Sequence, residues 1–96
     1  MTANTIINAT LDHFDLPAAE FIARNRDPRA VKAREVCAYL LRTYTGLSWH
    51  QIAAVMQRPG HTSALTMYQR VEARIMDDPE LAEVVNQIVK RAGKAT

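Results

Sequence analysis

Apolar residues recur at intervals of three or four positions along most of the chain, and no segment alternates polar and apolar residues for long enough to indicate a strand. A helix with this spacing carries one apolar stripe that it buries against its neighbours. We therefore expect an all-α fold, a compact bundle of about five to six helices around a central helix-turn-helix. Near the N-terminus, residues 5–14 predict a helix and residues 16–23 a short helical turn.

Two Asp-Pro pairs indicate where helices begin. Asp27-Pro28 and Asp78-Pro79 each place a capping carboxylate before a proline, and a proline loses no hydrogen bond at the first position of a helix. We expect helices to begin at about residues 28 and 79. The first should end near Gly46 and bury Val36, Leu40, Leu41 and Tyr44, and the second should bury Leu81, Val84, Val85 and Ile88 before Gly93.

A capping box precedes the next short helix. The Ser48 hydroxyl can accept a hydrogen bond from the backbone N–H of Gln51, while the Gln51 side chain can reach back to the N–H of Ser48. Leu47 and Ile52 occupy the positions of a hydrophobic staple, which fixes the start of such a helix. These signals predict a helix over residues 49–56.

A Pro-Gly pair then interrupts the chain at residues 59–60, and an apolar stripe resumes beyond it. A short helix, a tight turn and a longer second helix form a helix-turn-helix, which places the N-terminal residues of its second helix in the major groove of DNA. We expect this unit over residues 48–76, with the second helix over residues 62–76. Its buried stripe should consist of Ala64, Tyr68, Val71 and Ile75.

The start of this second helix carries polar side chains that suit base recognition. His61 can donate to or accept from a purine edge, the methyl group of Thr62 can contact thymine, and the Ser63 hydroxyl can bond to a base or a phosphate. A simpler interpretation is that Thr62 or Ser63 only caps the helix and that His61 is solvated. Away from the apolar stripe, the exposed face should carry Thr62, Thr66, Gln69, Arg70 and Ala73.

Charge is spread unevenly along the chain, whose formal net charge is +2. Residues 1–23 sum to −3, residues 24–74 to +6 and residues 75–96 to −1. A basic block of this kind indicates a polyanionic partner, although an ordinary solvated face gives the same pattern. Its densest part is the basic loop, residues 24–34, whose long cations can reach phosphates or a narrow minor groove. These cations are Arg24, Arg26, Arg29, Lys32 and Arg34.

Several functional classes lack support in the sequence. Cys37 is the only cysteine, so we expect it to pack as an apolar side chain without a disulfide, and the three histidines match no compact metal-ligand spacing. No nucleophile and base grouping and no Gly-rich phosphate loop are present, so we expect no enzyme, no catalytic residue, no metal and no cofactor. Without an apolar run of about 18 to 20 residues or a secretory leader, we expect a cytoplasmic protein and no membrane partner. The chain should form a single domain over residues 1–96.

Taken together, these residues resemble the C-terminal DNA-binding domain, domain IV, of DnaA, the bacterial chromosomal replication initiator. That domain has a helix rooted at a serine, a turn that ends in Arg-Asp-His-Thr-Thr-Val, and a second helix. The segment LSWHQIAAVMQRPGHTSALTMYQRV runs alongside it without a gap, and the likeness covers about residues 6–90. The resemblance implies that the partner is double-stranded DNA and that the protein is monomeric or weakly self-associating.

The resemblance also implies roles for individual side chains. Arg26 matches an arginine that enters the minor groove, Arg34 a contact to the DNA backbone or a groove, and Arg42 a cation that contacts phosphate. The triplet at residues 61–63 matches His-Thr-Thr, which reads bases and phosphates in the major groove. The full set of expected DNA contacts is Arg24, Arg26, Arg34, Arg42, His61, Thr62, Ser63, Thr66 and Arg70.

Three departures from the family pattern change what we expect of the function. Pro59-Gly60 replaces an Arg-Asp pair that could bond to guanine and to a cytosine or adenine amine, so the sequence preference should be altered or relaxed. Glu35 replaces a neutral polar residue and should repel a nearby phosphate. The chain has no nucleotide-binding ATPase sequence, so it should not initiate replication alone.

We therefore expect a nucleoid-associated transcriptional regulator, an activator of the kind found in phages or gene-transfer agents, that binds duplex DNA in a sequence-selective way. One alternative is a DNA-binding fragment of a replication initiator, or a competitor for its sites. A second alternative is a helical adaptor that uses an exposed region at Trp49, His50 and Met67 to bind RNA polymerase or another DNA-binding protein.

Overall fold

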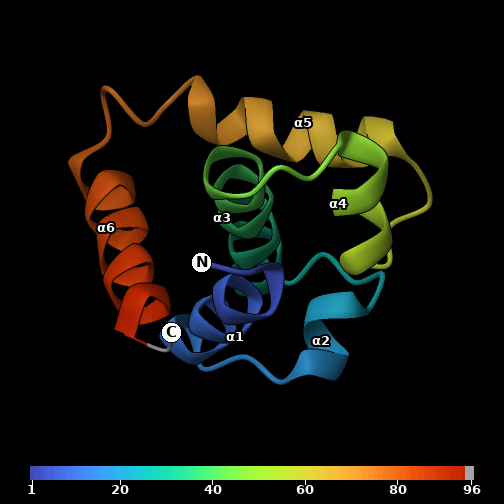
Figure 1. Ribbon diagram of the computed structural model, residues 1–96, viewed down its shortest axis with the longest axis horizontal. Helices are drawn as coiled ribbons and strands as arrows, with labels where there is room; N and C mark the ends of the chain where they lie inside the picture. Colours follow the sequence, from blue (N-terminus) through green and yellow to red (C-terminus); the bar gives the residue numbers. More distant parts are fainter. Residues whose placement is uncertain (95–96) are drawn as a thin grey trace.

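Residues 1–94, which the computed structural model describes, fold into six α-helices, and no strand occurs within this range (Figure 1). The predicted all-α fold is confirmed. The last two positions of the predicted domain, residues 95–96, lie outside the described residues. The helices are α1 (Ala3–Phe14), α2 (Ala18–Ile22), α3 (Pro28–Tyr44), α4 (Trp49–Val55), α5 (His61–Glu72) and α6 (Pro79–Lys94).

Side-chain caps start three helices where the sequence predicted them. Oδ1 of Asp27 accepts a hydrogen bond of 3.0 Å from the N–H of Arg29, and α3 begins at Pro28. Ser48 and Gln51 form the predicted capping box of α4, with N–H to oxygen distances of 3.1 and 2.9 Å. Asp78 accepts from the N–H three residues further on at 3.1 Å and so caps α6. Local chemistry alone was sufficient to locate these starts.

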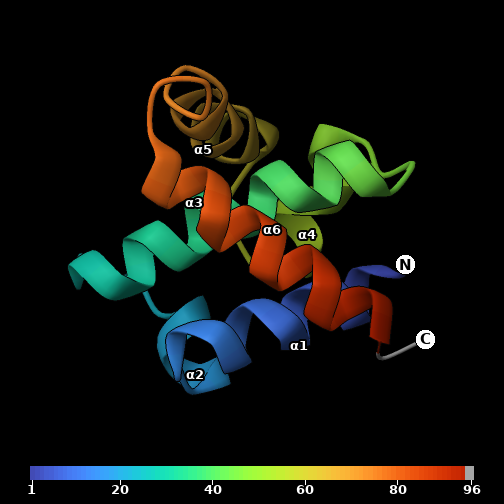
Figure 2. The same ribbon diagram turned by 90° about the vertical axis from the view of Figure 1, so that its left-hand side faces the viewer.

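α3 lies at the centre of the molecule and is seen nearly end-on in Figure 1. α5 packs across α3 on one side with α4 beside it, whereas α1 lies against α3 on the other side and contacts α6 (Figures 1 and 2). All six helices contribute residues to one buried apolar cluster. Small side chains in α3 let its neighbours approach closely, and they include Ala30, Ala33, Cys37 and Ala38.

The apolar stripe predicted for α3 is confirmed except at its end. Val36, Leu40 and Leu41 are buried, but Tyr44 is 45% exposed. Tyr44 is the last residue of the helix and lies beyond Leu41, the last buried residue of α3. The prediction for Tyr44 was wrong because helical spacing does not indicate where the neighbouring helices stop covering the stripe.

α5 differs from its prediction in both its end and its buried face. The helix ends at Glu72, and residues 73–76 form turns as the chain changes direction before α6. Met67, which was predicted to be exposed, is 9% exposed and belongs to the core, whereas Tyr68 is half-buried. The Tyr68 ring stacks on Tyr39 of α3, with 5.4 Å between the ring centroids. Ala64 and Val71 are buried as predicted, so the prediction was wrong only in placing Tyr68, and not Met67, in the core between them.

Cys37 packs as an apolar side chain, as predicted, and is fully buried. Burial raises the pKa of its thiol to about 12, against an opposing effect from a hydrogen bond with Thr10. A thiol with this pKa is protonated at neutral pH and reacts poorly as a nucleophile. The residue therefore contributes to the core.

The described residues contain neither a metal-binding cluster nor a membrane-spanning helix. No three side chains of His, Cys, Asp or Glu within residues 1–94 gather in a way that could hold a metal ion. None of the six helices is both long enough and apolar enough to cross a membrane.

Candidate nucleic-acid interface

α4, a tight turn and α5 form the predicted helix-turn-helix, in which the two helices pack against each other. Gln57 supports the reversal of the chain by adopting a left-handed backbone conformation with φ of 54°, which is uncommon for a residue with a side chain. Gly60 has an extended φ of −169°, and a Cβ placed there would meet no atom within 4 Å. Gly60 could therefore carry a side chain without disturbing the turn.

The first turn of α5 presents polar groups to solvent. We call His61, Thr62 and Ser63 the α5 tip. The N-cap residue is Gly60, and no side chain caps this helix, so the interpretation of Thr62 or Ser63 as the cap is wrong. His61 and Thr62 are exposed and Ser63 is half-buried. Since the first N–H groups of a helix also attract anions, the α5 tip offers donors for both base edges and phosphates.

His61 lies beside a second histidine of the helix-turn-helix. The centroid of its ring is 4.4 Å from that of His50 in α4, and the two rings are tilted by 43°. A ring packed on a neighbour has fewer rotamers than a fully solvated one, so less side-chain entropy is lost when it binds a partner. The geometry therefore favours an ordered His61 over a freely moving one.

A shallow cleft of about 480 Å³ lies between the basic loop and α5. Segments that are distant in the sequence supply its walls, and this brings seven of the predicted DNA contacts to one concave surface. Such a surface can place short polar side chains on base edges while cations reach the flanking phosphates. The seven residues are Arg24 and Arg26 from the loop, Arg34 from α3, and Thr62, Ser63, Thr66 and Arg70 from α5.

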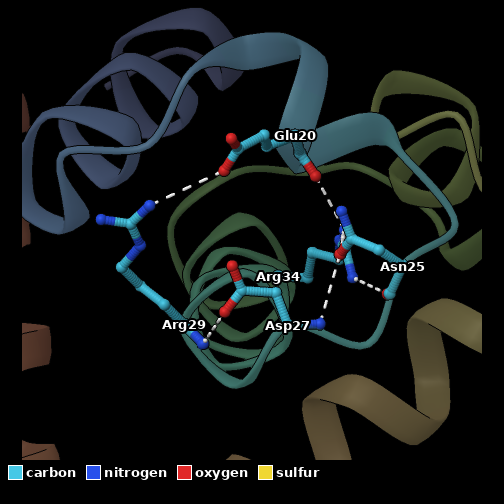
Figure 3. Close-up of polar contacts among 5 residues, drawn as sticks. All are labelled: Glu20, Asn25, Asp27, Arg29 and Arg34. Carbon is cyan, nitrogen blue, oxygen red and sulfur yellow. Dashed lines mark hydrogen bonds and ion pairs between the residues drawn. The ribbon is translucent and has the colours of Figure 1, made fainter.

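Arg24 and Arg26, which we call the outer arginines, extend from the basic loop at this cleft. Both residues are exposed, and within residues 1–94 neither side chain forms a hydrogen bond or an ion pair. Arg29, in contrast, lies 3.6 Å from a carboxylate oxygen of Glu20 (Figure 3). The outer arginines are therefore unpaired cations at this cleft, and they remain available to phosphates.

Arg34 has a different environment from the one predicted. The residue is 4% exposed. Its Nε donates to the carbonyl oxygen of Phe21 at 2.7 Å and its Nη1 to that of Asn25 at 2.9 Å. Its Nη2 donates to the carbonyl oxygen of Glu20 at 2.8 Å and to the Asn25 side chain (Figure 3). The same nitrogen donates to the carbonyl oxygen of Ala23 at 2.9 Å. Because all three nitrogens already donate within the chain, a direct DNA contact does not fit this position, and Arg34 stabilises the loop.

Arg58 is a second arginine of this kind, and the sequence analysis missed it. Its Nη2 donates to the carbonyl oxygens of Phe21, Ile22 and Ala23, at 3.4, 2.7 and 3.0 Å. We call Arg34 and Arg58 the inner arginines. Burial lowers the pKa of both guanidinium groups, and the charge of Arg58 lowers that of Arg34 further. No local signal marks Arg58, since these three acceptors are backbone atoms 35 to 37 residues away in the sequence.

Glu35 forms ion pairs with two arginines at the wall of the cleft. One of its carboxylate oxygens lies 3.1 Å from Nη1 of Arg70 and the other lies 3.7 Å from Nη2 of Arg74. Glu35 is 7% exposed, whereas the Arg70 side chain is 60% exposed. The acid that was expected to repel phosphate is therefore paired with two cations, and the three groups together carry a net positive charge.

Arg42 is a predicted contact that lies apart from the cleft. Its Nη1 donates to the carbonyl oxygen of Leu47 at 3.1 Å, and its guanidinium carbon lies 4.3 Å from the centroid of the Trp49 ring. The residue remains exposed. The structure thus places Arg42 in the last turn of α3, where its side chain packs beside the start of α4.

Comparison with known proteins relates this arrangement to one family. The family model of the bacterial DnaA protein helix-turn-helix matches residues 3–71. The chain is similar to the chromosomal replication initiator protein DnaA of Mycoplasma genitalium, with 31% identity over 84 residues that cover 88% of this chain and 19% of that protein. It is also similar to the DnaA proteins of Lachnoclostridium phytofermentans and Gloeobacter violaceus, each with 28% identity over 91 residues, or 95% of this chain. The chain spans about a fifth of the length of these relatives.

Proposed function

Because the chain belongs to the family of bacterial DnaA helix-turn-helix domains, as the sequence predicted, we propose that this DNA-binding domain acts as a sequence-selective regulator of transcription. The observation that supports the proposal best is the cleft in which the outer arginines and the hydroxyl groups of α5 face the same space. Those are the groups that a duplex requires from its partner, since cations fix position on the phosphates and short polar side chains read bases.

In the proposed complex, the α5 tip enters the major groove and faces the base edges. Thr66 and Arg70 follow one and two turns further along α5, where they face the groove wall and the phosphates. The outer arginines reach the neighbouring backbone or the minor groove, and Arg42 contacts a phosphate on the opposite flank. The protein binds as a monomer associated with the nucleoid, and RNA polymerase or another DNA-binding protein is its further partner in regulation.

A role in replication is the second candidate, and the similarity to replication initiators favours it. In that role the chain competes for initiator sites or serves as the DNA-binding part of a longer initiator. The two candidates differ at Pro59-Gly60, because this pair replaces the Arg-Asp of the family pattern. A regulator with its own sites should select a sequence different from that of an initiator, whereas a competitor should select the same one.

The adaptor alternative receives less support from the geometry. It requires Trp49, His50 and Met67 to form one exposed surface, but Met67 is 9% exposed and Trp49 is half-buried. The Trp49 ring packs edge-on against Tyr68, with 5.2 Å between the ring centroids. These side chains contribute mainly to packing between α4 and α5.

Selection of bound duplexes from a random-sequence pool, followed by titration of the selected duplex at several salt concentrations, tests the proposal. With about five phosphate contacts, the logarithm of the association constant should fall against the logarithm of the salt concentration with a slope of about −4.5. A selected duplex should also bind at least about a hundredfold more tightly than random DNA. Absence of enrichment in the selection, or binding that is indifferent to salt, would contradict the proposal.

A further inference from the structure

Arg58 connects the helix-turn-helix to the start of the basic loop, the two parts of the structure that form the proposed DNA-binding surface. The residue belongs to the turn between α4 and α5, yet its guanidinium group bonds to the backbone at the end of α2, where the basic loop begins. No other hydrogen bond from a side chain connects the helix-turn-helix to this segment within residues 1–94. Arg58 is thus the polar link between the segment that carries the outer arginines and the segment that carries the α5 tip.

Arg58 shares two of its backbone acceptors with Arg34. The carbonyl oxygens of Phe21 and Ala23 each accept from both inner arginines, one reaching them from α3 and the other from the turn. Carbonyl groups at the end of a helix have no partner within the helix, and a guanidinium group has donors enough to serve several at once. The backbone that leads into the basic loop is consequently held from two sides.

A loop held in this way loses less conformational freedom when it binds a partner. Ordering a flexible residue has an entropic cost, and a surface that is already ordered binds more tightly for the same contacts. The outer arginines follow Ala23 directly or within three positions in the sequence. The hydrogen bonds to the carbonyl groups of residues 21–23 therefore help to set the position of the outer arginines. A lysine in place of Arg58 would keep the charge but could not reproduce the planar, multiple donation.

We propose that Arg58 is a positioning residue that fixes the basic loop to the helix-turn-helix, so that the outer arginines and the α5 tip meet DNA as one preorganised surface. The inference rests on the proposed DNA-binding function and deepens it. In this account Arg58 acts through Arg26 and does not itself need to contact a phosphate.

A double-mutant cycle separates positioning from direct contact. Arg58→Lys is measured in the parent, in an Arg26→Ala background and in a Thr62→Ala background, with the selected duplex at one salt concentration. We expect Arg58→Lys to weaken binding about tenfold in the parent and in Thr62→Ala, but by less than about twofold in Arg26→Ala. Arg91→Lys, an exposed position of α6, is the matched control and should leave binding unchanged.

Amide hydrogen exchange on the free protein supplies a second readout that needs no DNA. Arg58→Lys should increase exchange in the segment from residue 21 to residue 27 and leave α3 and α5 unchanged. Arg58→Gln, which removes the charge and leaves only a shorter amide group as donor, is measured in parallel. It should increase exchange in the same segment, and it replaces the lysine variant if that variant does not fold.

Each remaining outcome is decisive. An equal loss of affinity in all three backgrounds would show that Arg58 contacts DNA directly or acts on stability alone. Parent-like binding of Arg58→Lys would show that the link is dispensable. Both results overturn the inference and leave the proposed function intact. Failure of the parent itself to bind any duplex would instead overturn the proposed function, and with it this inference.

Discussion

The inner and outer arginines show how one residue type serves opposite purposes within the same part of the molecule. Arg26 and Arg34 both belong to the basic segment of residues 24–34 and look equivalent in the sequence, although the structure places Arg34 in α3. In the structure, the Arg34 side chain donates hydrogen bonds to backbone carbonyl groups. Arg26, in contrast, is exposed and forms no hydrogen bond or ion pair within residues 1–94. An arginine in a basic segment is therefore available to a partner only if its N–H groups are not already bonded within the fold.

The largest expected effect comes from breaking the inner set. Arg34→Ala removes the donors that serve the carbonyl groups of Glu20 and Asn25, and it leaves these partly buried acceptors without their partner. We expect the free energy of unfolding to fall by about 3 kcal/mol, measured by urea denaturation. The control is Arg24→Ala, which should change it by less than about 0.5 kcal/mol. Similar stability of the two variants would contradict the division into inner and outer arginines.

The outer set should show the reverse behaviour, with an effect on binding and none on folding. Arg26→Ala should weaken binding of the selected duplex by about 2 kcal/mol if the side chain enters a groove. Its urea denaturation curve should overlay that of the parent. Lys90→Ala, at an exposed position of α6, removes the same charge away from the cleft and serves as the control. A loss of affinity as large in the control would mean that only net charge matters.

The α5 tip should differ from the outer arginines in what it contributes to binding. Thr62→Ala should reduce the difference in binding free energy between the selected duplex and random DNA by about 1 kcal/mol, because a base contact is lost and no phosphate charge is involved. Binding to random DNA should change little. Parallel titrations of both duplexes measure this, and an equal loss on both would assign Thr62 to the phosphates.

Arg70 is intermediate between the two sets, since it pairs with Glu35 but remains largely exposed. Glu35→Gln keeps an acceptor for Arg70 and removes the negative charge beneath it. We expect DNA binding to strengthen by about 0.5 kcal/mol at low salt, with the gain fading as salt rises. Glu83→Gln changes the same charge on α6 and is the matched control. Weaker binding of Glu35→Gln would indicate that the carboxylate charge is needed to orient Arg70.

Helix starts could be predicted from the sequence because their signals are local. The carboxylates of Asp27 and Asp78 and the hydroxyl of Ser48 bond to N–H groups two or three residues away. The end of α5 carries no such signal: residues 73–76 contain no Gly or Pro, and the helix stops there because the chain turns toward α6. The burial of Met67 depends likewise on how α5 lies on α3, which periodicity alone cannot specify.

The candidate site was predictable in part for the same reason. The exposure of the α5 tip follows from the spacing of apolar residues along α5. The cleft brings α5 next to the basic loop, and the sequence analysis had named both segments as DNA contacts. The contrast between Arg26 and Arg34 and the link made by Arg58 depend on carbonyl groups of residues 20–25, which only the folded chain brings to these side chains. Long-range backbone acceptors leave no pattern in the local sequence.

The most direct test of the account is a map of backbone amide chemical shifts by NMR as the selected duplex is added to the protein. If the basic loop and α5 form one DNA-binding surface, the largest changes should occur together in residues 24–26 and 61–70, with smaller changes near Arg42 and none along α6. Changes confined to one of the two segments, or concentrated in α1 and α6, would contradict the central claim.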